Sequence, residues 1–426
     1  MKRGKRLLAA LLGGLLIGLL PLGALAEEAP AVIVDIEGGE TAEALMAEDA
    51  DEVWEPVGTV PADTAALDVG GKSAVLMEQS SGDILFEKNP HEKMPIASVT
   101  KVMTLLLIME AVDSGKISWQ DMVTASEAAA AKGGSQVYLK VGETMSVEEM
   151  VKSITVSSAN DCACAMAEFI AGSEAGFVEK MNARAQELGM EDTHFVNCTG
   201  LDDEPSAAEH LTSAYDIALM SRELLLHHPD IKRFTTIWMD TVRNGAFGLA
   251  NTNKLVRFYE GTTGLKTGYT SSAGHCLSAS AQREGLELVA VVLHCSSSPD
   301  RFQSAKALLD YGFANYALVP VQEGEALAPV PVVLGEAGTV QPVASGEEQL
   351  LIDKSLRQSV TRTVELQPNV EAPVTQGQRL GTLTIQANGQ VLAEVPLVAQ
   401  EAVARLTWKD LFANILRRIC MAGQET

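Results

Sequence analysis

Ser98 and Lys101 are the first residues of this chain whose types and spacing could support catalysis. A separation of three places both side chains on one face of a helix, one turn apart. A serine hydroxyl becomes a nucleophile when a base takes its proton, and lysine can be that base if burial in an apolar helix lowers its pKa. The apolar stretch 99–112 supplies such a helix, whose N-terminus also offers N–H groups to an oxyanion. By itself, however, Ser-x-x-Lys is more often a capping serine and a solvated lysine.

Two later triplets make the pair more specific. Ser158-Ala159-Asn160 falls between two predicted helices, where the first and third side chains can face a common cleft. Lys266-Thr267-Gly268 falls on a predicted strand and offers a cation for a substrate carboxylate, a hydroxyl beside it, and a glycine that leaves room for a substrate close to the strand. Each triplet alone is more often structural, but the three in this order predict an active-site serine enzyme with Ser98 as nucleophile.

The elements that must position these motifs predict an α+β fold. Strands at residues 72–77 and 83–86 form a hairpin, and helical patterns continue to about residue 226, including a capping box at Ser146 and Glu149. Strand patterns return at residues 264–268, 276–281 and 286–293, followed by a helix at 301–315. A helical block inserted between two halves of an antiparallel sheet is an α+β arrangement.

At these motifs the chain resembles the low-molecular-weight penicillin-binding proteins, specifically the serine-type D-alanyl-D-alanine carboxypeptidases similar to peptidase family S11. Residues 96–104, 211–218 and 251–270 are also similar to that family, and the resemblance extends from about residue 69 to residue 317. It implies a β-lactamase/transpeptidase-like domain, followed by a small all-β domain and a C-terminal amphipathic helix.

The resemblance also implies a role for each motif. Ser98 would attack the carbonyl between the two terminal D-alanines of the peptidoglycan stem peptide, Lys101 would take its proton, and Ser158 would relay a proton toward the leaving amine. Water would then release the acyl group, whereas β-lactam antibiotics would acylate Ser98 and leave slowly. No cofactor or metal is implied.

Substrate-binding roles are implied for a second set of residues. Asn160 would hold the substrate amide and Lys101. Lys266 and Thr267, on the strand that also carries Gly268, would bind the terminal carboxylate, with Arg301 a weaker candidate for the same charge. The backbone N–H groups of Ser98 and Tyr269 would form the oxyanion hole.

The chain departs from the family pattern at two places. Thr199-Gly200-Leu201 stands where relatives often carry His-Gly-Leu, and Cys162 and Cys164 replace residues that are commonly alanine-like. Neither change removes a catalytic group, although both can alter packing near the second motif.

Alternative functions share the same motifs. A β-lactamase would need an efficient deacylation base, and no obvious glutamate with a supporting asparagine precedes residues 211–216. A DD-endopeptidase or a transpeptidase would differ only in substrate or acceptor. A non-catalytic β-lactam sensor or wall-binding module is disfavoured because every catalytic group is present.

The N-terminus predicts export. Four basic residues precede an apolar run at residues 7–20, and Ala24-Leu25-Ala26 follows, which is the layout of a secretory signal peptide over residues 1–26. An uncleaved anchor is the alternative, but the run is short for a full span.

The remaining chain is strongly acidic. Removing the four basic residues leaves 28 basic and 56 acidic residues, a net charge of −28, which argues against a nucleic-acid partner. Thirteen of the acids lie in residues 27–68, predicted to be a disordered, solvated spacer.

The C-terminal part predicts two further units. The serine enzyme domain is expected at residues 69–318, and a small β domain at 319–399 contains an Asn388-Gly389 hairpin turn. Residues 400–426 include a helix with one apolar face: Trp408, Leu411, Phe412, Ile415, Leu416 and Ile419. Such a helix suits the outer face of the cytoplasmic membrane, with packing on the β domain as the alternative.

The six cysteines are interpreted as thiols rather than a disulfide framework. Cys162 and Cys164 share one helical turn, and Cys198, Cys276 and Cys295 fall in predicted core segments. A long apolar chain does not need disulfides as a small secreted domain does. No Cys/His spacing resembles a zinc site.

Overall fold

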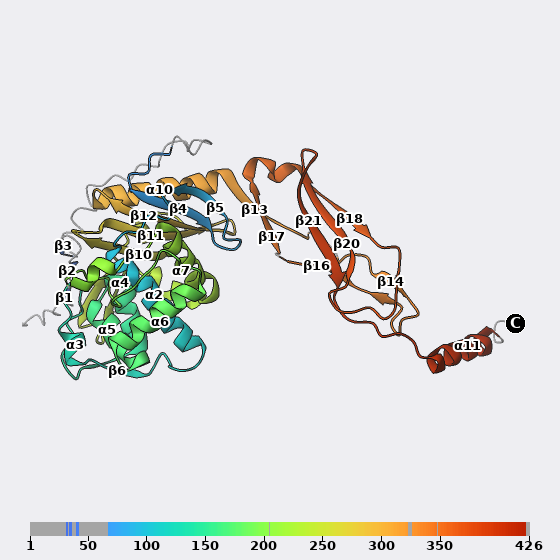
Figure 1. The fold of residues 1–426 in the computed structure, drawn as a ribbon, viewed down its shortest axis with the longest axis horizontal. Coiled ribbons are helices and arrows are strands. Elements are labelled where there is room, and N and C mark those ends of the chain that lie inside the picture. The colour runs from blue at the N-terminus through green and yellow to red at the C-terminus, as the bar shows by residue number, and fades with distance from the viewer. Residues whose placement is uncertain are drawn as a thin grey trace, which may run out of the picture.

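The structure is a computed structural model that describes residues 67–203, 205–322, 326–346 and 348–422, with the pieces 31–32, 34–35 and 40–41. Figure 1 shows an elongated molecule with a mixed α+β domain at one end, a β domain in the middle and helix α11 at the other end. The predicted signal peptide and most of the predicted acidic spacer lie outside the described residues.

A five-stranded antiparallel sheet organises the first domain, with the strand order β10-β11-β12-β4-β5. The two halves of this sheet come from opposite ends of the domain, as the sequence predicted. Helix α10 covers one face of the sheet and the helical block lies on the other (Figure 1). The strands are β4 (Ser73–Glu78), β5 (Ile84–Lys88), β10 (Thr262–Thr270), β11 (Gly274–Arg283) and β12 (Leu286–Cys295).

Helix α2 (Lys101–Asp113) is the centre of the helical block. Almost every residue from Lys101 to Ala111 is buried, so the helix lies inside the domain rather than on its surface. Ser146 caps helix α4 as predicted, because its Oγ accepts from Glu149 N at 3.2 Å. The helices of this domain are α2, α3 (Glu127–Ala130), α4 (Val147–Ser157), α5 (Asn160–Ala171), α6 (Glu174–Glu187), α7 (Ala214–His227), α8 (Lys232–Thr235), α9 (Leu255–Phe258) and α10 (Ser298–Asn315), with 3₁₀ turns η2 (Ala97–Thr100), η3 (Pro205–Glu209) and η4 (Pro229–Ile231).

Short strands complete this domain. β6 (Met122–Thr124) pairs with β7 (Thr144–Ser146), and β8 (Met239–Val242) pairs with β9 (Phe247–Ala250). Three two-residue strands belong to the predicted spacer: β1 (Ala31–Val32), which pairs in parallel with β9, and β2 (Val34–Asp35) and β3 (Glu40–Thr41), which pair with each other.

The second domain is all-β, as the sequence predicted. Its longest hairpin joins β20 and β21, and the turn residues Asn388 and Gly389 have φ values of +50° and +81°, as a type I′ turn requires. The strands are β13 (Tyr316–Pro320), β14 (Val330–Val333), β15 (Thr339–Val340), β16 (Pro342–Ala344), β17 (Gln349–Asp353), β18 (Val360–Leu366), β19 (Val370–Glu371), β20 (Arg379–Ala387) and β21 (Gln390–Ala399), with the 3₁₀ turn η5 (Lys354–Ser359).

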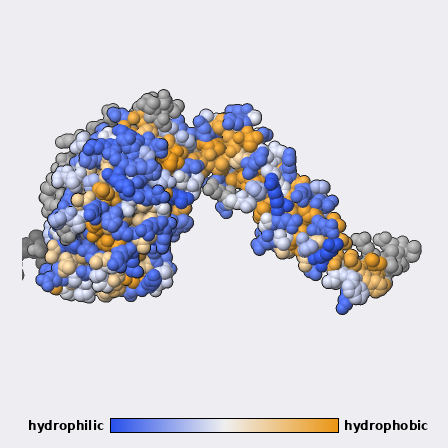
Figure 2. All heavy atoms as spheres, viewed as in Figure 1, coloured by the Kyte–Doolittle hydropathy of each residue, from blue (hydrophilic) through white to orange (hydrophobic). Residues whose placement is uncertain are grey.

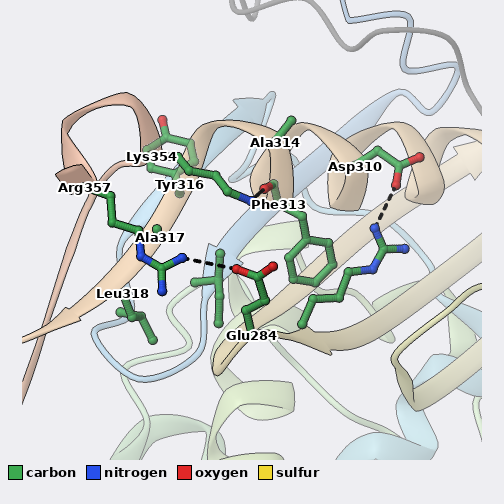
Figure 3. A pocket seen from close by; sticks show the side chains of 11 residues that line it. Glu284, Asp310, Phe313, Ala314, Tyr316, Ala317, Leu318, Lys354 and Arg357 are labelled. Atoms are coloured by element: carbon green, nitrogen blue, oxygen red, sulfur yellow. Dashed lines mark hydrogen bonds and ion pairs between the residues drawn. The ribbon is translucent and has the colours of Figure 1, made fainter.

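The junction between the domains contains no connecting loop, because α10 ends at Asn315 and β13 begins at Tyr316. Strand β13 runs across the boundary predicted between residues 318 and 319 and pairs with β17. A cavity of about 260 Å³ lies at the junction. Arg357 of η5 lies 3.2 Å from Glu284 of the first domain, and Lys354 donates to the Phe313 carbonyl at 2.9 Å. Figure 3 shows both contacts.

Helix α11 (Trp408–Ala422) lies at the far end of the β domain. Its described apolar side chains are exposed, from 37% for Leu411 to 73% for Trp408, and apolar surface is visible there in Figure 2. Within the described residues, no helix combines the length and apolar character needed to cross a bilayer.

Candidate active site

The structure brings Ser98 and Lys101 together. Ser98 lies in η2, directly after Ala97, whose φ of +48° turns the chain sharply. Lys101 is the first residue of α2 and is fully buried. Its Nζ lies 2.8 Å from Ser98 Oγ. An amine is therefore within hydrogen-bond distance of the hydroxyl whose proton must leave, which is the geometry that a serine nucleophile needs.

The second contact of Lys101 is with a backbone carbonyl. Nζ donates to Thr199 O at 2.9 Å. Thr199 occupies the position where relatives often carry histidine, and here the main chain rather than the side chain meets the lysine. Asn197 Oδ1 accepts from Thr199 N and Gly200 N at 3.1 and 2.6 Å and so holds this turn in place. Sequence reasoning missed this contact because a backbone acceptor can belong to any residue type.

Glu174 holds the same turn by accepting hydrogen bonds from Cys198. Cys198 donates to Glu174 Oε1 through its backbone N–H at 3.3 Å and its thiol at 3.2 Å, while Lys132 Nζ lies 2.7 Å from Oε2. Burial alone would raise the pKa of Glu174, but the Lys132 ammonium and the Cys198 donors outweigh it and lower that pKa. Lys132, Glu174 and Thr199 also line a cavity of about 390 Å³.

The five cysteines with described side chains are buried and no disulfide joins them, in agreement with the sequence interpretation: Cys162, Cys164, Cys198, Cys276 and Cys295. Burial is the first cause that raises the pKa of Cys295, to about 12. Thiols with raised pKa values are poor nucleophiles at neutral pH. No cluster of three or more potential metal ligands occurs within the described residues.

Ser158 and Asn160 occupy the tight connection between α4 and α5. Ser158 has a left-handed φ of +64°, and Asn160 begins α5 and donates through Nδ2 to Gly133 O at 2.8 Å. Ser158 Oγ and Asn160 Oδ1 are buried and have no hydrogen-bond partner within the described part of the chain. Buried polar atoms are seldom left unsatisfied, so both oxygens are candidates for contact with a substrate.

Asp161, which sequence reasoning did not single out, anchors the loop beside Asn160. Its carboxylate accepts from the backbone N–H groups of Leu139 at 2.9 Å and Val137 at 3.2 Å. Burial raises the pKa of Asp161 above its ordinary value despite these bonds. The loop that accepts from Asn160 is therefore tied to the helix that Asn160 begins.

The third motif lies on β10, as predicted, next to η2, the turn that carries the candidate nucleophile Ser98 and that we call the nucleophile turn. Lys266 and Thr267 are buried. Thr267 Oγ1 donates to Thr252 Oγ1 at 2.6 Å, and Thr252 N donates to Val156 O at 3.1 Å, two residues before Ser158. Thr252 thus connects the second and third motifs, a contact that the sequence did not predict.

The glycine at position 268 has a structural reason besides the predicted one. A Cβ there would lie 2.5 Å from Ile96 O and 3.0 Å from Val99 N. The missing side chain therefore lets β10 approach the backbone around Ser98. The close approach holds the strand against the nucleophile turn.

Tyr269 and Arg301 lie at the same strand. The Tyr269 ring stacks on His275 of the neighbouring strand, with centroids 4.4 Å apart. Arg301 is buried on α10 and its Nη1 donates to Gly268 O at 3.3 Å. The guanidinium is therefore placed at the backbone of the third motif, next to the two residues expected to bind a carboxylate.

His210 is a buried titratable group near the nucleophile turn. Its pKa is lowered from 6.5 to about 4, first by burial and then by His194. Between these two pH values the unfolded chain binds a proton that the folded chain does not, so the free energy of unfolding decreases by about 1.4 kcal/mol for each unit by which the pH is lowered. This contribution is fully present above pH 6.5 and is lost progressively toward pH 4.

We therefore expect His210→Gln to flatten the dependence of stability on pH. From pH 7 to pH 5 the unmodified protein should lose about 2 kcal/mol more stability than the variant. Urea titrations followed by tryptophan fluorescence measure this difference, and Trp119 and Trp238 report on the first domain. Equal losses in the two proteins would contradict the assignment of a low pKa to His210.

Comparisons with known proteins match both domains to described families. Residues 60–297 match the family model for D-alanyl-D-alanine carboxypeptidase, peptidase S11, and residues 319–405 match that for the C-terminal domain of penicillin-binding protein 5. The chain is 43% identical over 343 residues to D-alanyl-D-alanine carboxypeptidase DacF of Bacillus subtilis, covering 79% of this chain and 87% of that protein.

Two solved structures are similar as well. Penicillin-binding protein 5 from Haemophilus influenzae has a TM-score of 0.70 and 30% identity, covering 82% of this chain and all of that one. Penicillin-binding protein D2 from Listeria monocytogenes, solved in an ampicillin-bound form, has a TM-score of 0.53 and 32% identity, covering 58% of this chain and 99% of that one.

Proposed function

This chain belongs to the serine-type D-alanyl-D-alanine carboxypeptidases of peptidase family S11, and we propose that Ser98 is the nucleophile with which it removes the terminal D-alanine from stem peptides. Membership implies a peptidoglycan peptide as substrate, binding of β-lactams, and a place outside the cytoplasm. The observation that carries the assignment is the contact of buried Lys101 with Ser98 Oγ at 2.8 Å and with Thr199 O at 2.9 Å.

Lys101 acts as the base in acylation. A neutral amine has two hydrogens and one lone pair. In the structure Nζ donates both to Ser98 Oγ at 2.8 Å and to Thr199 O at 2.9 Å. For acylation the amine has to be neutral, and its lone pair then accepts the proton of the Ser98 hydroxyl across the same contact. As Ser98 Oγ bonds to the carbonyl carbon of the penultimate D-alanine, its proton passes to Lys101 Nζ. The backbone N–H groups of Ser98 and Tyr269 receive the oxyanion.

The other two motifs bind the substrate and release the leaving group. Ser158 Oγ relays a proton to the amine of the departing D-alanine, and Asn160 Oδ1 accepts from the substrate amide. Lys266 and Thr267 hold the terminal carboxylate, and Arg301 adds positive charge behind them. These roles are supported by the unsatisfied oxygens of the second motif and by the Thr252 contacts that join it to the third.

Mass spectrometry after penicillin treatment tests the nucleophile directly. We expect one adduct per chain, on the proteolytic peptide that contains Ser98, and competition for this site by a stem-peptide mimic. Rapid turnover of penicillin without release of D-alanine would favour a β-lactamase instead. An adduct on any other peptide would show that Ser98 is wrongly assigned.

We propose further that α11 binds the outer face of the cytoplasmic membrane. Trp408, Phe412 and Ile415 are each more than half exposed, and burying such side chains in the interface stabilises binding by about 1.5–3 kcal/mol each. Lys409 supplies a cation on the same helix.

Replacing Phe412 and Ile415 by aspartate should therefore lower vesicle binding at least tenfold. Co-sedimentation of the full chain with phosphatidylglycerol vesicles measures the bound fraction. Val364→Asp is the matched control, because Val364 is an exposed apolar residue of the β domain away from this helix. Unchanged binding after substitution on α11 would refute the anchor.

A further inference from the structure

The Ala97–Ser98 peptide group connects the nucleophile turn to a second set of buried residues. Ala97 is buried with a left-handed φ of +48°. In a trans peptide the carbonyl of residue 97 and the N–H of residue 98 lie in one plane and point in opposite directions. Whatever holds the Ala97 oxygen therefore also sets the direction of the Ser98 N–H, which is the proposed oxyanion donor.

Two residues hold the Ala97 oxygen. Thr100 Oγ1 donates to it at 2.8 Å. Gly200 packs against it so closely that a Cβ at position 200 would lie 1.8 Å away. A hydroxyl has a single hydrogen, and that of Thr100 is used here. Thr100 Oγ1 can therefore only accept from its other neighbour, His210 Nε2, which lies at 2.7 Å.

The opposite nitrogen of His210 fixes the direction of this chain of hydrogen bonds. Val196 N lies 3.2 Å from His210 Nδ1, and a backbone N–H can only donate. Nδ1 therefore accepts, and the ring proton is on Nε2, where it donates to Thr100. The Phe195 ring packs edge-on against the imidazole, with centroids 5.6 Å apart. The low pKa of His210 keeps the ring in this neutral form at ordinary pH.

We propose that His210 and Thr100 are positioning residues for the oxyanion hole. The hydrogen bonds run from imidazole to hydroxyl to the Ala97 carbonyl. They orient the peptide whose N–H points at the reacting carbonyl. Each bond also polarises the next, so that donation to the Ala97 oxygen makes the Ser98 N–H a stronger donor. Neither residue exchanges a proton with substrate. The inference rests on the proposed function, because it requires Ser98 to be the nucleophile.

Thr100→Val tests the proposal with almost no change in shape, and Thr100→Ser is its matched control because it keeps the hydroxyl. A removed oxyanion donor costs about 100- to 1,000-fold in rate, so a misdirected one should cost about 10- to 100-fold. We expect Thr100→Val to lose this factor in kcat for D-alanine release and in acylation by penicillin, with KM within about twofold. The affinity of an acylaminoalkyl boronic acid, which forms a tetrahedral adduct on serine, should fall by the same factor.

His210→Phe breaks the same chain one step earlier. We expect His210→Phe to lower kcat and the acylation rate by a similar factor. The double variant should be no slower than the slower single variant, because both changes interrupt the same series of hydrogen bonds. Thr100→Ser should stay within about threefold of the unmodified enzyme. Melting temperatures identify any variant that fails to fold. If Thr100→Val does not fold, the proposal is tested by comparing the acylation rate of His210→Phe with that of Thr100→Ser.

Several results would overturn the proposal: a folded Thr100→Val enzyme with an unchanged acylation rate, a loss confined to KM, or losses that multiply in the double variant. Ser98→Ala in the same labelling assay separates this outcome from failure of the proposed function. If Ser98→Ala is still labelled, the nucleophile itself is wrong. If labelling needs Ser98 and ignores Thr100, only the positioning role is wrong.

Discussion

Replacing Ser98 by alanine is expected to abolish both covalent labelling by penicillin and release of D-alanine. The change removes only the hydroxyl that lies 2.8 Å from Lys101 Nζ, and Lys101 keeps its bond to Thr199 O. Loss of a nucleophile that works together with its base costs about four or more orders of magnitude in kcat. A fluorescent penicillin followed on a denaturing gel, together with an enzymatic assay for D-alanine, measures the two activities.

Ser114→Ala is the matched control for this experiment. Ser114 follows the last residue of α2, at the opposite end of the helix that begins with Lys101. The Ser114→Ala variant should keep full penicillin labelling and full D-alanine release. If D-alanine release survives in Ser98→Ala, another group performs the attack and the proposed mechanism is refuted. The melting temperature of the variant should stay close to that of the unmodified protein, because no buried apolar volume is lost.

Gly200→Ala is expected to have the second largest effect, through the backbone. Gly200 has a φ of +82°, and a Cβ there would lie 1.8 Å from Ala97 O and 2.8 Å from Thr100 Oγ1. The new methyl group must push the Ala97 carbonyl away, and with it the turn that carries Ser98. We expect a loss of about 100-fold or more in kcat/KM and a destabilisation of about 2 kcal/mol or more.

Gly189→Ala is the control that separates the steric overlap of a new Cβ with Ala97 from the strain of placing alanine at a positive φ. Gly189 has a similar φ of +73°, but a Cβ there would meet nothing within 4 Å. This control should cost about 1 kcal/mol of stability, because alanine disfavours positive φ, and should leave kcat unchanged. Urea titration and penicillin acylation rates compare the two variants. Equal behaviour of the two would mean that the contact with Ala97 does not hold the nucleophile turn.

Much of the fold could be predicted because local patterns determine it. Ser146 was recognised as a helix cap from the glutamate three positions later, and Asn388-Gly389 was recognised as a hairpin turn because both residues tolerate positive φ. The three motifs proposed to be catalytic could be singled out because their residue types are rare in combination. Their expected settings, at the start of a helix, between two helices and on a strand, all appear in the structure.

The residues that position the motifs could not be predicted, because their contacts are distant in sequence or use the backbone. The Thr199 carbonyl carries no signal in the residue type. His210 and Thr100 are 110 positions apart, so nothing local connects them. Gly268 was noticed, but its close approach to the main chain of Ile96 was not foreseen. In each case the missing information was which segments the fold brings together.

The direct passage from α10 into β13 has a mechanical consequence. Because no loop separates the two elements, the chain has little freedom to rotate at the junction. Arg357 contacts Glu284 and Lys354 contacts Phe313 across it. We therefore expect the β domain to act as a spacer between the first domain and α11. If α11 rests on a bilayer, the length of this spacer sets how far from the membrane Ser98 can reach a stem peptide.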